Sequence, residues 1–293
     1  MCGLFYNCNS LKSLNINNFN TASVNTFLGM FYNCKSLTTL NLSSFNTLNA
    51  IDMGEMFYGC NSLISLDVTN FDTHLVTTMY SMFYGCNTIT SLNLSNFDTS
   101  SVKEMNKMFK NCSSLKALNL NNFITSSVTN MASMFESCES LSDLDLGNFD
   151  TSSVIDIHNM FSNCYSLTTL NLSSFNTFLV SNMTKTFDGC NINLLYCINN
   201  KEYNLNGKLL EELIKNSFLN NNCSQLCSLK NGKYIFEKEI CLINCYDDDI
   251  YKFEYENICY ESCPNGTQIS KDNEYLCIKE NRFIISTILF YYY

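Results

Sequence analysis

The sequence is poor in arginine and carries an excess of acidic residues. Arg282 is the only arginine among 17 basic residues, and the formal net charge over 293 residues is −10. Arginine forks and basic surfaces are what nucleic-acid phosphates require of a protein. We therefore exclude nucleic acid as a partner.

Tryptophan is absent, and Pro264 is the only proline. Together with abundant asparagine, lysine, isoleucine, phenylalanine and tyrosine, these scarcities indicate AT-rich coding sequence, so a high asparagine count alone predicts nothing about function. Long apolar runs are scarce as well. The run at 283–293 has 11 residues, whereas a membrane-spanning helix needs about 20. We expect this run to be either the start of a membrane anchor that continues beyond the C-terminus or a final strand.

A repeat of fixed length dominates the rest of the sequence. A phenylalanine stands three residues before every cysteine of a regular ladder, from Phe5 to Phe187. The ladder consists of eight cysteines at intervals of 26 residues: Cys8, Cys34, Cys60, Cys86, Cys112, Cys138, Cys164 and Cys190. A fixed period of this length is typical of stacked supersecondary units, none of which buries its apolar face alone.

The repeat at 98–123 illustrates the expected elements. Its first apolar positions fall within an arc of about 120° on a helix; they are Val102, Met105, Met108, Phe109 and Cys112. Ser101 and Glu104 fit a capping box at the start of that helix. Leu118 and Leu120 alternate with polar residues, which predicts a short strand with one buried face. We expect an α/β repeat, a right-handed and slightly curved solenoid with parallel strands on one side and short helices on the other.

The same unit resembles a known family. Leu115, Leu118 and Leu120 form the pattern Leu-x-x-Leu-x-Leu of leucine-rich repeats. The sequence of residues 97–123, FDTSSVKEMNKMFKNCSSLKALNLNNF, resembles BspA-type leucine-rich-repeat surface proteins of bacteria and parasitic protists. The resemblance covers residues 1–190 and implies a leucine-rich-repeat-like solenoid that adheres to proteins of a host or neighbouring cell, with no catalytic residues. Phe123 departs from the family pattern, because ordinary repeats place there an asparagine that ties the turn. The turn amides must therefore find other partners.

The cysteine ladder allows three interpretations: metal ligands, disulfides, or buried apolar side chains. Zinc requires four converging ligands, whereas each repeat supplies one thiol and the only histidines are His74 and His158. Disulfides require Cα atoms within about 7 Å, and we expect neighbouring helices to lie about 8–10 Å apart. We favour free thiols that act as small buried apolar groups.

A polar column lies between the strand leucines and must point away from the core. Its members include Asn41, Asp67, Asn93, Asn119, Asp145 and Asn171. One hypothesis is a solubilising face whose side chains satisfy one another. The other is a binding face for an extended protein or glycan, because repeat proteins bind ligands on such surfaces. On the second hypothesis, substitutions here weaken binding and leave stability unchanged.

Paired carboxylates, which acid–base catalysis needs, are lacking on this face. Asp67 and Asp145 lie three repeats apart, about 14 Å at strand spacing. This separation is too large for the two carboxylates to act as acid and base on one bond. We predict that the protein is not an enzyme and uses neither cofactor nor metal. The Asp247-Asp248-Asp249 run lacks the glycine and spacing of a calcium loop, so we interpret it as a solvated loop.

The repeat ends after Cys190, and three parts are predicted: a solenoid at 1–190 with a truncated first repeat, a capping helix segment at 191–222, and a cysteine-rich module with an apolar end at 223–293. Eight cysteines in or near this tail predict disulfides, with a zinc site as the alternative. The disulfide candidates are Cys197, Cys223, Cys227, Cys241, Cys245, Cys259, Cys263 and Cys277.

Met1 occupies the position that Met53 and Met79 hold in later repeats. We therefore expect the chain to begin inside a repeat and a signal peptide to lie upstream. Glycosylation sequons such as those at Asn93 and Asn265 are compatible with an extracellular location. The sequence predicts an extracellular or cell-surface adhesion or ligand-binding protein. The alternative is an intracellular repeat scaffold for protein–protein interaction with a zinc-binding tail.

Overall fold

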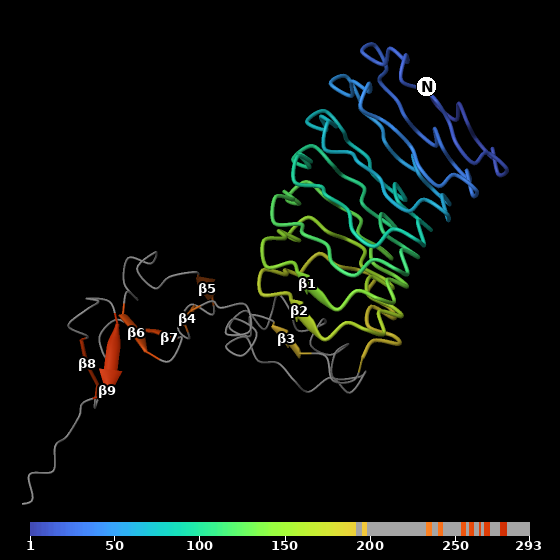
Figure 1. Ribbon diagram of the computed structural model, residues 1–293. Coiled ribbons are helices and arrows are strands. Elements are labelled where there is room, and N and C mark those ends of the chain that lie inside the picture. Colours follow the sequence, from blue (N-terminus) through green and yellow to red (C-terminus); the bar gives the residue numbers. More distant parts are fainter. Residues whose placement is uncertain are drawn as a thin grey trace, which may run out of the picture. The chain divides into compact units, whose positions relative to one another are not determined.

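The computed structural model describes residues 1–191, Pro264, Leu276 and the short strands β3 to β9. The chain divides into two compact units, 1–222 and 223–293. In the first unit the repeats wind into successive coils that lie side by side (Figure 1). The predicted capping segment at 191–222 and the apolar run at 283–293 lie outside the described residues, apart from Asn191 and β3, and the predicted domain boundaries stay predictions.

Each coil comprises one repeat and lies in register with the next. Parallel bridges join Thr26 to Asp52 and Asp52 to Thr78, and they continue at the same interval as far as Asn182. Alongside the bridges, alternate N–H groups donate to a carbonyl of the following coil, as from Phe109 to Met134 at 3.0 Å. The repeat nature predicted from the sequence is therefore confirmed.

The predicted helices are absent from the described residues, so the predicted fold class is wrong. Within 105–112, the N–H groups of Met108, Lys110 and Cys112 donate to the carbonyl three residues earlier, as from Met108 to Met105 at 3.2 Å. Ser101, expected to cap a helix, instead donates its hydroxyl to the carbonyl of His74 in the preceding coil, at 3.1 Å. The segment is a series of tight turns whose remaining hydrogen bonds join neighbouring coils.

Two left-handed residues in every coil account for the missing helices. Lys107 has φ 59° and Asn111 has φ 61°, and the corresponding residues of the other coils share this conformation. The position before the cysteine is occupied by Asn7, Asn33, Gly59, Gly85, Asn111, Ser137, Asn163 and Gly189. A right-handed helix cannot contain such residues, and glycine and asparagine adopt the conformation at the lowest cost. This column of asparagine, glycine and serine is the sequence signal that the helical prediction overlooked.

Regular strands are short. In the first unit, β1 (Asp143–Asp145), β2 (Thr169–Asn171) and β3 (Leu195–Cys197) form a parallel sheet in which Leu144 pairs with Leu170. An isolated bridge joins Ser91 to Ala117 on the same side of two earlier coils.

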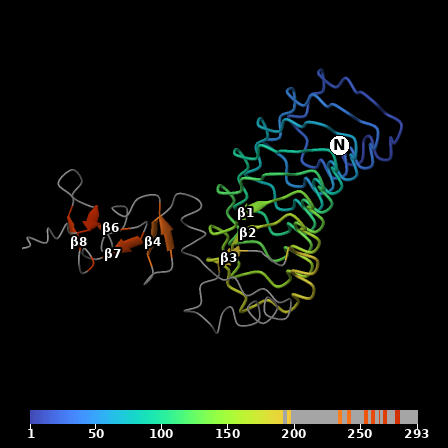
Figure 2. The same ribbon diagram turned by 60° about the horizontal axis from the view of Figure 1, so that its bottom comes forward.

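In the second unit, four strands form a sheet in the order β5-β4-β7-β6, and two strands form an antiparallel pair, β8-β9. They are β4 (Lys233–Ile235), β5 (Ile240–Leu242), β6 (Phe253–Tyr255), β7 (Ile258–Tyr260), β8 (Thr267–Ile269) and β9 (Cys277–Lys279). Figure 2 labels β4, β6, β7 and β8 of this unit.

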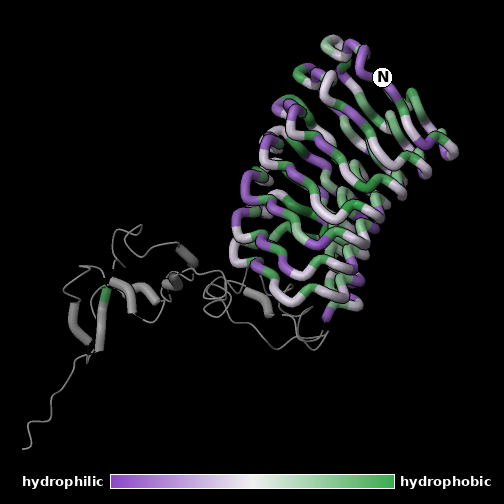
Figure 3. The backbone as a smooth tube through the Cα atoms, viewed as in Figure 1, coloured by the Kyte–Doolittle hydropathy of each residue, from purple (hydrophilic) through white to green (hydrophobic). Residues whose placement is uncertain are grey.

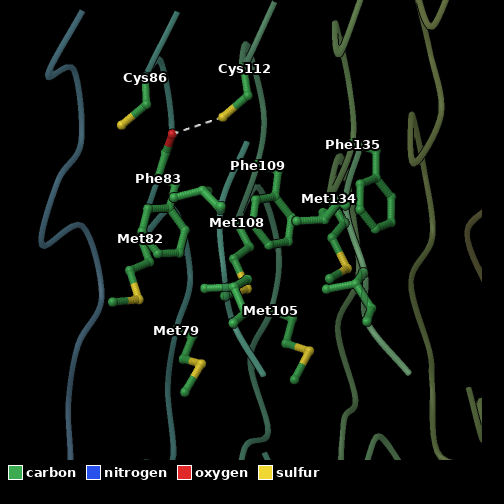
Figure 4. Close-up of a cluster of buried hydrophobic side chains, with 14 of the residues drawn as sticks. Met79, Met82, Phe83, Cys86, Met105, Met108, Phe109, Cys112, Met134 and Phe135 are labelled. Atoms are coloured by element: carbon green, nitrogen blue, oxygen red, sulfur yellow. Dashed lines mark hydrogen bonds between the residues drawn. The ribbon is translucent and has the colours of Figure 1, made fainter. Parts of the chain in front are cut away.

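One continuous core runs through the coils. Phe109 is fully buried and stacks between Phe83 and Phe135, with ring centroids 5.7 Å apart on both sides. Methionine and leucine columns pack beside this phenylalanine column. Figure 4 shows the methionines, among them Met105 and Met108. Apolar and polar stretches alternate along each coil and recur from one coil to the next (Figure 3). Each coil therefore covers the apolar edge of its neighbour, as the fixed period requires.

Candidate binding surface

Every outward position of the repeat forms a column along the coils, because residues at the same position of successive repeats lie in register. Some inward columns keep one type of residue, such as the phenylalanines that end in Phe187, whereas another changes from Met160 to Thr186. Outward columns change from coil to coil: one of them holds Tyr58 and Tyr84, then Lys110 and Glu136. A binding site can arise where an outward column carries residues that the fold does not require.

The predicted ligand face consists of side chains that hold turns. The Oδ1 atom of Asn93 accepts a hydrogen bond from the N–H of Ser95 at 3.1 Å, and Asp145 accepts one from Gly147 at 3.0 Å. The same bond to the residue two positions later recurs at Asn41, Asp67, Asn119 and Asn171. These oxygens satisfy backbone N–H groups that would otherwise lack a partner.

The face keeps some capacity to bind a ligand. Asn41, Asp67, Asn93 and Asn119 are exposed, whereas Asp145 and Asn171 are half-buried and bonded to each other at 2.8 Å. Two hydrogen bonds from Thr69 hold the pKa of Asp67 below its usual value, so this carboxylate is charged at neutral pH. Since the oxygens are engaged, the amide hydrogens of the exposed asparagines and the charge of Asp67 are what this face offers.

In the turn that contains Phe123, the N–H of Asn121 donates to Oδ1 of Asn119 at 3.0 Å and the N–H of Phe123 donates to the carbonyl of Leu120 at 2.9 Å. The residue before Phe123, Asn122, donates its amide hydrogens to the carbonyls of Leu94 and Phe97 in the preceding coil, both at 2.9 Å. Asn148 makes equivalent bonds one coil later. These asparagines link neighbouring coils.

Buried threonines form a further link between coils. The hydroxyl of Thr99 donates to the carbonyl of Ile124 at 2.9 Å and accepts the N–H of the same residue at 2.8 Å. Thr47 makes the same pair of bonds with Asp72. Each hydroxyl thus satisfies a donor and an acceptor at once in the interior.

A second outward column consists of stacked tyrosines in the first four coils. Tyr6, Tyr32, Tyr58 and Tyr84 have ring centroids 4.5, 4.4 and 4.3 Å apart and planes within 9° of each other. The last three are half-buried, and Asn111 donates a hydrogen bond to the hydroxyl of Tyr84 at 3.2 Å. The sequence prediction missed this column, although a tyrosine follows the ladder phenylalanine in each of these four repeats.

Two half-buried carboxylates lie near this column. Burial, and then the charge of Asp52, raise the pKa of Glu55, while Lys107 opposes them. Burial likewise raises the pKa of Asp52, and the N–H of Gly54 opposes it with a hydrogen bond at 2.8 Å. Burial raises the pKa of Tyr80, and the charges of Glu55 and Asp52 add to the effect. The carboxylates and this tyrosine therefore share one electrostatic neighbourhood.

The ring of Tyr80 fills the space that a side chain at Gly54 would occupy. A Cβ atom added there would lie 2.6 Å from Cε1 of the tyrosine. Only glycine at this position leaves room for the ring, which places an aromatic side chain directly beside Asp52 and Glu55.

The ladder cysteines are free, and those from Cys34 to Cys190 are buried, whereas Cys8 is half-buried. The spacing expected between them is wrong. Neighbouring coils pair as parallel bridges, at about 4.8 Å, and not as helices at 8–10 Å. Distance therefore does not exclude a disulfide between neighbouring cysteines. Each thiol from Cys34 to Cys190 donates instead to a backbone carbonyl, as from Cys112 to Phe83 at 3.1 Å.

Within the described residues, no three histidine, cysteine or acidic side chains gather into a group able to hold a metal ion. The side chains of all eight disulfide candidates lie outside the described residues, and so does the Asp247–Asp249 run. In the part of the chain that the structure describes, no helix has the length and apolar character needed to cross a bilayer.

Comparison with known proteins identifies the repeat. The chain matches the family described as "Mycoplasma protein of unknown function, DUF285" twice, over residues 1–116 and 79–194. Together the two matches span the coils. No curated protein and no solved structure matches the chain.

Proposed function

We propose that this chain, which belongs to the DUF285 family, is a non-enzymatic binding protein located at the cell surface or outside the cell. Its ligand is an extended protein or glycan that contacts the outward columns of several coils. The likeness of its repeat to BspA-type surface proteins supports the location.

The contrast between inward and outward columns carries this proposal. The inward column of Phe109 keeps phenylalanine in all eight coils, whereas the outward position next to it changes from Tyr84 to Lys110 and Glu136. A core that is held constant beneath a variable, periodic surface is what repeat proteins use to present binding residues. The amide hydrogens of Asn93 and Asn119 and the carboxylate of Asp67 supply polar contacts in another outward column.

Antibody labelling of intact cells tests the location. We expect an antibody against the purified full chain to label unpermeabilised cells, and brief trypsin treatment to remove the label. Labelling that requires permeabilisation contradicts the proposal and favours the intracellular scaffold. In that case, zinc bound to the purified chain, measured by mass spectrometry, would support a metal-binding tail.

Binding is tested with the full chain immobilised on a sensor surface and a panel of purified extracellular proteins and glycans. We expect saturable binding of at least one of them, reduced by the triple substitution Asn41→Ala, Asn93→Ala and Asn119→Ala or by changes in the tyrosine column. Failure of every member of the panel to bind would contradict the proposed function.

A further inference from the structure

We propose that Tyr32, Tyr58, Tyr84, Asp52 and Glu55, here called the tyrosine–acid face, form a docking surface for a lysine-rich polypeptide segment. This inference rests on the proposed binding function and names its partner class.

The fold does not require tyrosine in this column. In the following coils the same position holds Lys110 and Glu136, which form an ion pair at 2.7 Å, and the coils there keep the same bridges and the same phenylalanine stack. Glu55 stands at a left-handed position, φ 56°, where the adjacent coils have Gly29 and Ser81. The fold alone therefore explains neither the tyrosines nor this carboxylate.

The tyrosine rings are prearranged by stacking against one another. Stacking at 4.4 and 4.3 Å fixes the rings of Tyr32, Tyr58 and Tyr84 while leaving them half-exposed. Tyrosine supplies a large contact area at a low cost in side-chain entropy, and a prearranged surface loses less freedom on binding. The row of rings therefore meets the usual requirements of an interface core.

The two carboxylates form no ion pair with any described residue. Ion pairs among the described residues join His74 to Asp72, Lys110 to Glu136, and His158 to Asp156, and neither Asp52 nor Glu55 takes part in one. Asp52 and Glu55 are half-buried and carry like charges, and the charge of Asp52 raises the pKa of Glu55. A cation bound beside them would offset that repulsion, so charge complementarity favours a positively charged partner.

Lys107 is a cation that acts on this face, since its charge lowers the pKa of Glu55. It does not form an ion pair with that carboxylate. The repeats before residue 98 add only two lysines, Lys12 and Lys35, and no arginine, against the carboxylates Asp52, Glu55, Asp67 and Asp72.

Ring geometry favours lysine over arginine and over a sugar. Sugars and guanidinium groups pack on the open faces of aromatic rings, but the faces of Tyr32 and Tyr58 cover each other. The carboxylates and the oxygens of the hydroxyl groups, which also hydrogen-bond to one another along the column, remain as acceptors. A lysine ammonium is a compact charge with three donors, which suits an array of hydroxyl and carboxylate oxygens.

Fluorescence anisotropy of fluorescein-labelled octalysine with the full chain tests the proposal. We expect Asp52→Asn with Glu55→Gln to weaken binding by about tenfold or more, because the substitutions remove the charges that select the peptide. The matched control is Asp98→Asn with Asp150→Asn, which removes the same charge elsewhere and keeps each side-chain oxygen that accepts from Ser100 and Ser152. We expect the control to change the affinity by less than about twofold.

Tyr58→Lys provides a second variant that the fold accepts, since the coil after Tyr84 has Lys110 in this column. We expect it to weaken octalysine binding by about tenfold with an unchanged melting curve by circular dichroism. Equal weakening by both acid double variants would show diffuse attraction and overturn the proposal, as would no binding of octalysine by the native chain. Cell labelling and panel binding would still decide the proposed function.

Discussion

The thiol of Cys112 donates a hydrogen bond to the carbonyl oxygen of Phe83 in the preceding coil, with 3.1 Å between the two atoms (Figure 4). Cys138 bonds to Phe109 in the same way at 3.2 Å. The cysteine column and the phenylalanine column are therefore linked along the coils. The ladder thiols act as cross-coil donors as well as apolar side chains.

This contact predicts that ladder thiols resist modification in the folded protein. We expect iodoacetamide near pH 8 to alkylate Cys112 at least about a hundredfold more slowly than exposed Cys2, because only the thiolate of an accessible cysteine reacts. Peptide mapping by mass spectrometry compares the two sites in one sample. Equal rates would show that the column opens readily, and denaturation in urea should remove the difference.

Alkaline conditions should destabilise the coils through the same thiols. Burial raises the pKa of Cys112 and of Cys190 to about 12 from an unfolded value near 9. Their contribution to stability is complete below pH 9, and it is lost as the pH rises from 9 to about 12, because only the unfolded chain releases the proton. Urea unfolding at a series of pH values measures this decline, and Cys112→Ala should make it less steep. An equally steep decline in the variant would contradict the assignment.

The left-handed turn before each cysteine predicts an asymmetric response to substitution. Gly85 has φ 71°, and an added Cβ would find its nearest neighbour 3.5 Å away, so space is sufficient. Gly85→Ala should nevertheless cost about 1–2 kcal/mol because alanine is strained in this conformation. Ser137→Gly, at the same position of another coil, should be neutral or stabilising. If Gly85→Ala leaves the free energy of unfolding in urea unchanged, the left-handed conformation at this position is contradicted.

The column of the predicted ligand face should affect stability, contrary to the expectation from sequence. Asn93→Ala removes the acceptor of the Ser95 N–H and should cost about 0.5–1.5 kcal/mol. Asn93→Asp keeps an acceptor, as Asp67 and Asp145 do in their coils, and should cost less. Thermal melting compares the two variants, and an unchanged midpoint for Asn93→Ala would assign the column to binding alone.

The two hydrogen bonds between the Thr99 hydroxyl and the next coil can be tested with substitutions that hardly change the shape of the side chain. Thr99→Val leaves the N–H and the carbonyl of Ile124 without their buried partner and should cost about 2–4 kcal/mol. Thr99→Ser retains the hydroxyl and should cost clearly less. If urea unfolding shows valine to be as stable as threonine, the reciprocal pair of bonds is not formed.

The sequence alone determined the length of the repeat and which side chains are buried together. Phe109, Met108 and Cys112 form inward columns because apolar side chains must leave water in any stack of identical units. The exposed asparagines of the polar column, such as Asn93, lie outside for the same reason. The function remains a proposal, since outward residues report what the fold tolerates and do not identify a ligand.

Only the tertiary structure decided how the backbone of each repeat is hydrogen-bonded. The spacing of Val102, Met105, Phe109 and Cys112 suits one face of a helix, but it also suits successive turns, because both place every third or fourth residue inward. The choice depends on whether an N–H finds its acceptor within the repeat or in the next coil, which is a long-range event. The tyrosine–acid face arises in the same way: Tyr58 and Tyr84 belong to successive repeats, and only the register of the coils brings their rings to 4.3 Å.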